Sequence, residues 1–180
     1  MAKILYVYGY GGSPVGSTAT TLRRLLPQHE LCCINYPQYD GRLAHATLCH
    51  FVKSEQVSLV VASSLGAFLS LAIPDVDRIV INPCMLPSVE LPKIQVDRAM
   101  CATYAPFEQR VMYPDVDAAR RTVGVFSTRD ELLEDRYSAH FASHYGRIVF
   151  TDRCGHKANE DMLLHDVVPL IVGVDRQCNQ

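Results

Sequence analysis

Short apolar runs recur along the chain, and segments whose apolar residues lie three or four positions apart separate them. Continuous apolar runs are typical of strands buried on both faces, whereas the longer spacing is typical of amphipathic helices. The runs predict six strands, at residues 4–8, 31–35, 57–61, 76–82, 122–127 and 147–151. The spacing predicts helices at residues 18–26, 41–54, 67–72, 132–143 and from residue 159 onward.

This alternation of strands and helices predicts an α/β fold. Strands that are joined through helices make right-handed crossovers, which give a mostly parallel sheet with helices on both faces. The 180 residues are enough to bury a substantial core, and we expect one domain over residues 1–180.

Residues 83–121 interrupt the alternation. This connection contains five prolines and no predicted strand, and connections longer than about 15 residues are usually functional or disordered. Its apolar side chains, among them Met85, Tyr104 and Phe107, argue against disorder. We interpret the segment as a partly helical cap over a pocket, although a structural excursion that covers the sheet fits the pattern equally well.

Charge and cysteine content narrow the possible partners. A formal net charge of −2 gives no basic surface for nucleic acid. The seven cysteines form no C-x-x-C pair and no zinc-ligand spacing, so we expect free thiols in a reducing cytoplasm and no metal site. The first apolar run is too short for a signal peptide, and no stretch approaches the roughly 18 apolar residues of a membrane span. A cytoplasmic location is therefore expected.

The turn after the third predicted strand carries the first candidate for chemistry. Residues 62–66, Ala-Ser-Ser-Leu-Gly, match the G-x-S-x-G pattern with alanine in the first position. In that pattern the serine sits on a strained strand-to-helix turn, where bulky neighbours would collide with the backbone. The pattern predicts that Ser64 is a nucleophile. On its own, the same turn is equally consistent with a serine that caps the next helix.

An acid and a base follow in the order that this scaffold requires. Asp130 follows the fifth predicted strand and His156 the sixth. The carboxyl ends of parallel strands lie at one edge of the sheet, so Ser64, Asp130 and His156 are expected to meet there. Asp130 could instead cap the next helix, with Glu131 or Asp152 as the acid, and His156 could be a surface residue.

The glycine-rich loop after the first strand allows two interpretations. As an oxyanion loop, it offers the backbone N–H of Tyr10 to complement that of Leu65. As a phosphate loop, Gly11 to Thr18 has the glycine spacing of a Walker A motif, but Ser17 stands where the lysine is needed. Nucleotide binding is therefore disfavoured. The residues expected to contact substrate are Gly11, Met85, Tyr104, Phe107 and Arg129.

Several of these motifs together resemble one family. Residues 6–14, Tyr-Val-Tyr-Gly-Tyr-Gly-Gly-Ser-Pro, are similar to the strand and H-G-F-x-S-S-P loop that open the small YqiA-like esterases of the α/β-hydrolase superfamily. Residues 62–66 resemble their G-S-S-L-G turn, and Ile81-Asn82-Pro83 resembles their Asn-Pro turn. Asp130 and His156 fall where that family keeps its acid and histidine. Two departures are Tyr8 in place of histidine and Ala62 in place of glycine.

The resemblance covers nearly the whole chain and has definite implications. It implies a compact three-layer α/β-hydrolase fold that lacks the first two strands of larger relatives, with strand order 2-1-3-4-5-6. It also implies hydrolysis of carboxylic esters or thioesters of small to medium acyl chains, with no cofactor. Ser64 is then the nucleophile, His156 the base and Asp130 the orienting acid. The alternative is a catalytically silent small-molecule binding protein of the same fold, because fold alone does not determine function.

Overall fold

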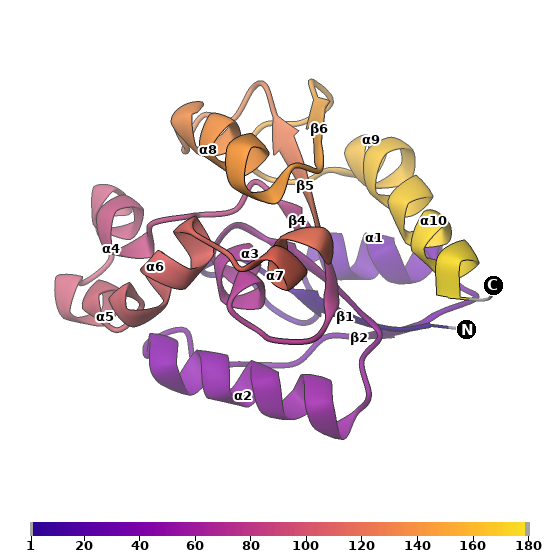
Figure 1. The fold of residues 1–180 in the computed structure, drawn as a ribbon, viewed down its shortest axis with the longest axis horizontal. Coiled ribbons are helices and arrows are strands. Elements are labelled where there is room, and N and C mark those ends of the chain that lie inside the picture. Colours follow the sequence, from indigo (N-terminus) through magenta and orange to yellow (C-terminus); the bar gives the residue numbers. More distant parts are fainter. Residues whose placement is uncertain (1, 179–180) are drawn as a thin grey trace.

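A six-stranded sheet organises the chain (Figure 1). The computed structural model describes the backbone of residues 2–178 and the side chains of residues 2–173. The strands are β1 (Lys3–Val7), β2 (Glu30–Cys32), β3 (Leu59–Ser63), β4 (Asp77–Ile81), β5 (Thr122–Ser127) and β6 (Ile148–Thr151). The helices of the first half are α1 (Ser17–Leu25), α2 (Gly41–Ser54) and α3 (Ser64–Leu71). Those that follow are α4 (Pro87–Glu90), the 3-10 helix η1 (Leu91–Ile94), α5 (Arg98–Ala102), α6 (Ala105–Met112), α7 (Val116–Arg120), α8 (Arg136–Tyr145), α9 (Glu160–Met162), the π-helical turn η2 (Leu163–Val167) and α10 (Val168–Cys178).

The strands run parallel in the order β2-β1-β3-β4-β5-β6, which confirms the predicted topology. The central strands explain why the sequence shows continuous apolar runs rather than alternation. Val60, Val61 and Ala62 of β3 are fully buried, because helices cover both faces of the sheet.

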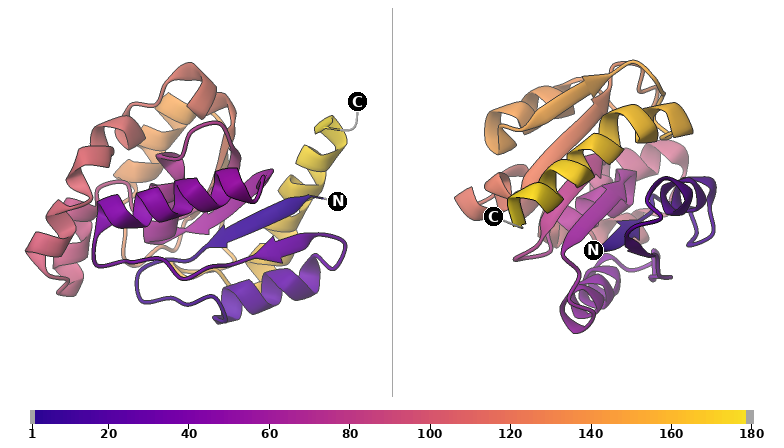
Figure 2. Two further views of the ribbon diagram at one scale, coloured as in Figure 1. Left: turned by 90° about the horizontal axis from the view of Figure 1, so that it is seen from below. Right: turned by 90° about the vertical axis from the view of Figure 1, so that its right-hand side faces the viewer.

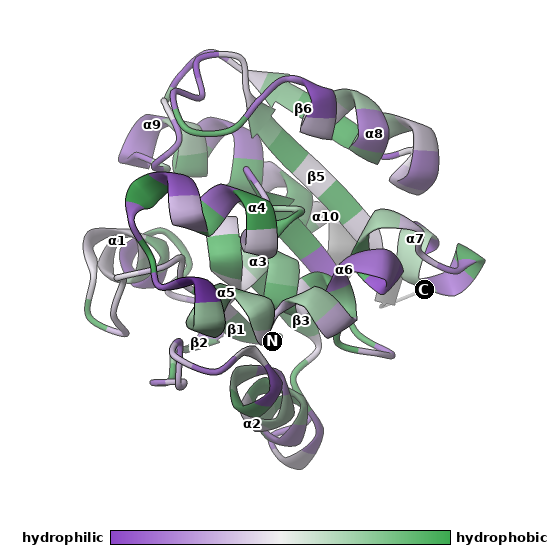
Figure 3. Ribbon diagram, turned by 90° about the vertical axis from the view of Figure 1, so that its left-hand side faces the viewer, coloured by the Kyte–Doolittle hydropathy of each residue, from purple (hydrophilic) through white to green (hydrophobic). Residues whose placement is uncertain are grey.

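Two groups of helices form the outer layers. Helices α1 and α10 lie on one face of the sheet, and α2, α3 and α8 lie on the other (Figures 1 and 2). Helix α1 lies on the opposite face from the helices of the later connections because crossovers between parallel strands are right-handed. The connection from β1 to β2 moves along the sheet in the opposite direction from every later connection. Strand β5 and helix α3, which packs on the sheet, are both made largely of hydrophobic residues (Figure 3).

The segment at 83–121 contains η1 and four short helices, in keeping with its expected partial helicity. Helices α4 and α5 lie at the end of the molecule toward which the strands point (Figure 2). Several predicted boundaries need correction. Strand β3 spans Leu59–Ser63 rather than 57–61, and α3 begins at Ser64 rather than at residue 67. Strand β2 ends at Cys32 rather than at residue 35, because this edge strand pairs only with β1. Helix α8 begins at Arg136 rather than at residue 132, because the backbone before it turns around Asp130.

The six cysteines whose side chains are described carry free thiols, and the side chain of Cys178 lies outside the described residues. Across residues 2–178, no helix has both the length and the apolar character needed to cross a membrane.

Candidate active site

Ser64 lies on a sharp turn between β3 and α3. Its φ of +52° falls in the left-handed region, which is uncommon for a residue with a side chain. A Cβ on Gly66 would lie 2.4 Å from the backbone oxygens of both Val7 and Tyr8, so the last position of the motif admits only glycine. The first position of the motif accommodates a methyl group, since that of Ala62 is fully buried in the core.

Ser64, His156 and Asp130 form one hydrogen-bonded line. Nε2 of His156 lies 2.9 Å from Oγ of Ser64, and Nδ1 of the same ring lies 2.8 Å from Oδ2 of Asp130. Burial raises the pKa of Asp130, but hydrogen bonds from His156 and from two backbone N–H groups outweigh that effect and hold the pKa below its usual value. The carboxylate is therefore charged at neutral pH and accepts a hydrogen bond from the ring N–H.

The other two candidate acids do not face the ring. Oε2 of Glu131 accepts the backbone N–H of His156 at 2.8 Å. Asp152 is exposed and lies 3.8 Å from the guanidinium of Arg129. Among the three carboxylates considered from the sequence, Asp130 alone contacts the imidazole.

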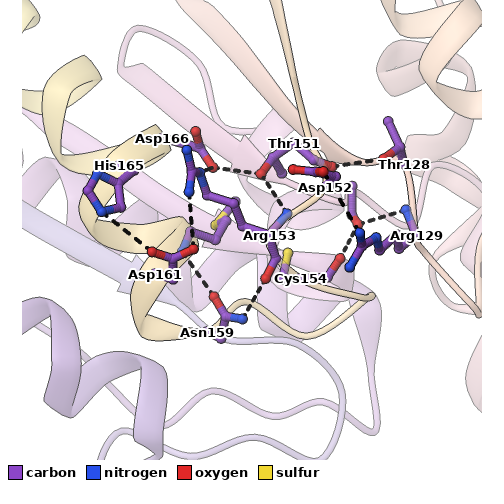
Figure 4. Close-up of polar contacts among 12 residues, drawn as sticks. Thr128, Arg129, Thr151, Asp152, Arg153, Cys154, Asn159, Asp161, His165 and Asp166 are labelled. Atoms are coloured by element: carbon purple, nitrogen blue, oxygen red, sulfur yellow. Dashed lines mark hydrogen bonds and ion pairs between the residues drawn. The ribbon is translucent and has the colours of Figure 1, made fainter.

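The loop that carries His156 is fastened at both ends (Figure 4). At its start, Thr151 Oγ1 donates to Asp166 Oδ2 at 2.7 Å, and Arg153 pairs with Asp161 at 3.2 Å. At its end, the side chain of Asn159 donates to the carbonyl of Arg153 at 2.7 Å and caps α9. These contacts tie the two ends of the loop to the final helical segment, and none of them involves residues 155 and 156.

The loop after β1 approaches the serine closely. A Cβ on Gly9 would lie 2.9 Å from Cβ of Ser64 and 3.5 Å from its Oγ, so a glycine lets the backbone come this near. Gln38 braces the loop: its amide donates to the carbonyl of Gly9 at 2.8 Å and accepts the N–H of Gly11 at 2.9 Å. Because Gln38 already binds the Gly11 N–H, that group is not available to a phosphate.

The backbone N–H groups without a protein acceptor in the described part of the chain include one in the turn after β3 and one in the loop after β1. One belongs to Leu65, in the first turn of α3, where N–H groups lack a partner within the helix. The other belongs to Tyr10, in the loop that Gln38 braces. These are the two groups that the sequence suggested as oxyanion donors.

A cavity of about 440 Å³ opens at Ser64 and His156. Gly11 and Tyr10 both line it. Leu91 and Ile94 of η1 contribute one apolar wall together with Leu132. The lining also contains hydroxyl-bearing residues, which besides Ser64 are Tyr6, Tyr8, Tyr10, Ser13, Ser17, Thr18 and Ser63. Among the described lining residues there is no carboxylate, and Lys157 provides a positive charge.

Four residues expected to contact substrate lie elsewhere. Met85 is fully buried in the core, and the ring of Phe107 packs against His45, with centroids 4.5 Å apart. The hydroxyl of Tyr104 donates to the carbonyl of Gln38, so this residue supports the brace rather than the cavity. Arg129 points to Asp152 on the surface.

Leu91, Ile94 and Leu132 were not anticipated as lining residues. Two of them lie on either side of Pro92 and the third precedes α8, and no local pattern distinguishes them from other apolar residues. Within the described residues, no group of three or more His, Cys, Asp or Glu side chains is arranged to hold a metal ion.

Comparison with solved structures identifies the fold. Est1E from Butyrivibrio proteoclasticus with bound ferulic acid is 11% identical, with a TM-score of 0.75 over 96% of this chain and 89% of that chain. The esterase domain of a Rhodothermus marinus protein is 16% identical, with a TM-score of 0.70 over 97% and 87%. A monoacylglycerol lipase from Paleococcus ferrophilus is 11% identical, with a TM-score of 0.70 over 96% and 93%. The chain matches no protein-family model, and no curated protein matches its sequence. At these identities the likeness establishes the α/β-hydrolase fold.

Proposed function

We propose that the chain is a serine hydrolase that cleaves carboxylic esters or thioesters through an acyl-enzyme. The hydrogen-bonded line from Asp130 through His156 to Ser64, at the mouth of a cavity, is the observation that carries the proposal. A serine hydroxyl is a weak nucleophile unless a base accepts its proton, and a neutral imidazole within 2.9 Å of the oxygen can do so.

Each residue has a defined part in the proposed reaction. Ser64 Oγ attacks the acyl carbonyl carbon while its proton passes to Nε2 of His156. Asp130 accepts a hydrogen bond from the Nδ1–H group, which keeps Nε2 free as an acceptor and stabilises the charged ring. The backbone N–H groups of Leu65 and Tyr10 bind the oxyanion of the tetrahedral intermediate. The intermediate collapses when His156 protonates the departing alcohol or thiol, and water then releases the acid by the same steps.

The cavity indicates the kind of substrate. Its volume of about 440 Å³ is within the range of small-molecule sites. The wall formed by Leu91, Ile94 and Leu132 suits an apolar acyl chain, and the absence of a carboxylate among the described lining residues disfavours a cationic substrate. We therefore propose neutral esters or thioesters with small to medium acyl groups.

A panel of p-nitrophenyl esters from acetate to dodecanoate, with matching thioesters, tests the proposal. The wild-type protein is expected to hydrolyse the shorter members, and Ser64→Ala to lower kcat by about 10³-fold or more. Ser70→Ala is a matched control on the same helix, since its hydroxyl donates to Ala67 and lies outside the cavity. A Ser64→Ala protein that keeps its turnover contradicts the mechanism. Folded wild-type protein that binds these compounds without turnover supports the silent binding protein instead.

A further inference from the structure

Asn82 is a buried polar residue that lies outside the cavity. It follows β4, is 1% exposed, and has a φ of +42°, a left-handed conformation that asparagine tolerates better than most residues. A buried amide is costly unless its donors and acceptor are bonded, so its partners indicate what it holds together.

The side chain of Asn82 joins three separate segments. Its Oδ1 accepts the backbone N–H of Ser127, at the end of β5, at 2.7 Å. Its Nδ2 donates to the carbonyls of Gly155 and His156, at 3.2 Å and 2.9 Å. One amide group thus connects the ends of β4 and β5 to the loop that carries the imidazole.

Glu131 accepts a hydrogen bond from the same stretch of backbone. Its Oε2 accepts the N–H of His156 at 2.8 Å, and a Cβ on Gly155 would lie 2.4 Å from that oxygen. Both polar groups of the His156 backbone are therefore bound to side chains from other loops. Glu131 is exposed and Asn82 is buried, so the bonds of Asn82 are the better shielded from water.

We infer that Asn82 is a positioning residue, which sets the backbone of His156 so that its ring spans Ser64 and Asp130. This inference rests on the proposed function. The ring must satisfy hydrogen bonds of 2.9 Å and 2.8 Å at its two nitrogens at once, so a small shift of its backbone weakens at least one of them. A misplacement of about 1 Å in a catalytic geometry can lower the rate by about 10²-fold.

Asn82→Asp tests the inference with almost no change of shape. The new carboxylate still accepts the Ser127 N–H, but it cannot donate to either carbonyl of the His156 loop and instead repels them. We expect kcat for a short ester to fall by 10- to 100-fold, in proportion to the displacement of the ring. KM is expected to stay unchanged, because Asn82 does not line the cavity.

Asn159→Asp is the matched control. Asn159 also donates to a carbonyl of this loop, that of Arg153, and its side chain caps α9. Aspartate is an equally good cap, so the control removes one bond to the loop without touching residues 155 and 156. Its kcat is expected to stay within threefold of wild type.

A spectroscopic measurement makes the test independent of turnover. The Nδ1 proton of His156, bonded to Asp130, is expected to give a low-field proton NMR signal that shifts or broadens in Asn82→Asp and not in Asn159→Asp. If Asn82→Asp does not fold, as judged by circular dichroism, Asn82→Gly replaces it, because glycine accepts the positive φ. A folded variant of either kind with an unchanged signal overturns the inference. If the wild-type protein is an active enzyme, an unchanged kcat in the folded Asn82 variant also overturns the inference. Inactivity of the wild-type protein, in contrast, contradicts the proposed function and leaves the NMR comparison to decide the role of Asn82.

Discussion

Replacing Asp130 by asparagine is the substitution whose result the structure specifies most closely. Oδ1 of Asp130 accepts the backbone N–H groups of Leu132 and Leu133, both at 2.9 Å. In Asp130→Asn the amide oxygen must take this place, because an NH₂ group there would face two donors. The NH₂ group then faces Nδ1 of His156 at the position that Oδ2 held, 2.8 Å away.

This orientation fixes the wrong tautomer of the ring. An amide NH₂ donates to Nδ1, so the ring proton moves to Nε2, which can no longer accept the proton of Ser64. The expected loss in kcat is about 10³- to 10⁴-fold, which corresponds to about 4 to 5.5 kcal/mol in the activation barrier. KM is expected to change little, because Asp130 does not line the cavity at Ser64.

Steady-state hydrolysis of a short p-nitrophenyl ester measures the effect, with circular dichroism to show that the variant folds. Asp152→Asn is the control, since that exposed carboxylate lies 3.8 Å from Arg129 and does not contact the ring. Its kcat is expected to stay within twofold of wild type. The reasoning is refuted if Asp130→Asn keeps more than a tenth of the wild-type kcat, or if Asp152→Asn loses as much.

Four further predictions follow from single side chains. Because the pKa of Asp130 is lowered in the folded state, its stabilisation is complete above the unfolded carboxyl pKa of about 3.9 and is lost as pH falls through the folded value. The melting temperature of the wild type should therefore fall more steeply than that of Asp130→Asn as pH is lowered from about 5 to about 2, and equal slopes contradict this. Gly66→Ala should destabilise the fold by about 3 kcal/mol or more in urea unfolding, since its Cβ meets two backbone oxygens at 2.4 Å, whereas Gly173→Ala, with open space around it, should be neutral or stabilising. Arg78→Met should cost about 3 kcal/mol or more in the same assay, because the buried guanidinium donates to three backbone carbonyls that would lose their donor, and a loss below 1 kcal/mol argues against this. Ile94→Trp should lower kcat/KM for octanoyl esters about tenfold and leave acetyl esters nearly unchanged, as expected if this wall holds the acyl chain, and an equal effect on both refutes that assignment.

The fold could be predicted from the sequence because its signals are local. A run such as Val60 and Val61 can be buried on both faces only in a covered sheet, and the strand order followed from the resemblance. Residues 41–54 and 122–127 form their elements with the predicted boundaries. The start of α8 was missed because it depends on Asp130, whose side chain holds the preceding backbone in a turn.

The lining of the cavity was less predictable. The apolar character of Met85 and Tyr104 was correctly recognised, but apolar spacing does not tell a core position from a cavity wall. Both are fully buried, and the hydroxyl of Tyr104 reaches a carbonyl 66 residues away in sequence. Leu91 and Ile94 face the cavity because a short 3-10 helix turns them toward it.

Long-range polar contacts could not be predicted from sequence patterns either. Asn82 bonds to Gly155 and His156, which lie 73 and 74 residues further along the chain. A single asparagine after a strand is as consistent with a simple turn as with a link between loops. Only the packing of three strand ends at one edge of the sheet shows which of the two it is.

Covalent labelling with a fluorophosphonate tests the central claim most directly, because this reagent reacts with a serine whose proton a neighbouring base removes. Mass spectrometry of the intact protein and of its peptides gives both the number of adducts and their position. The account predicts one adduct per chain, on Ser64, and a labelling rate that collapses in His156→Ala. Folded protein that takes up no adduct, or takes it up on Ser63, would contradict it.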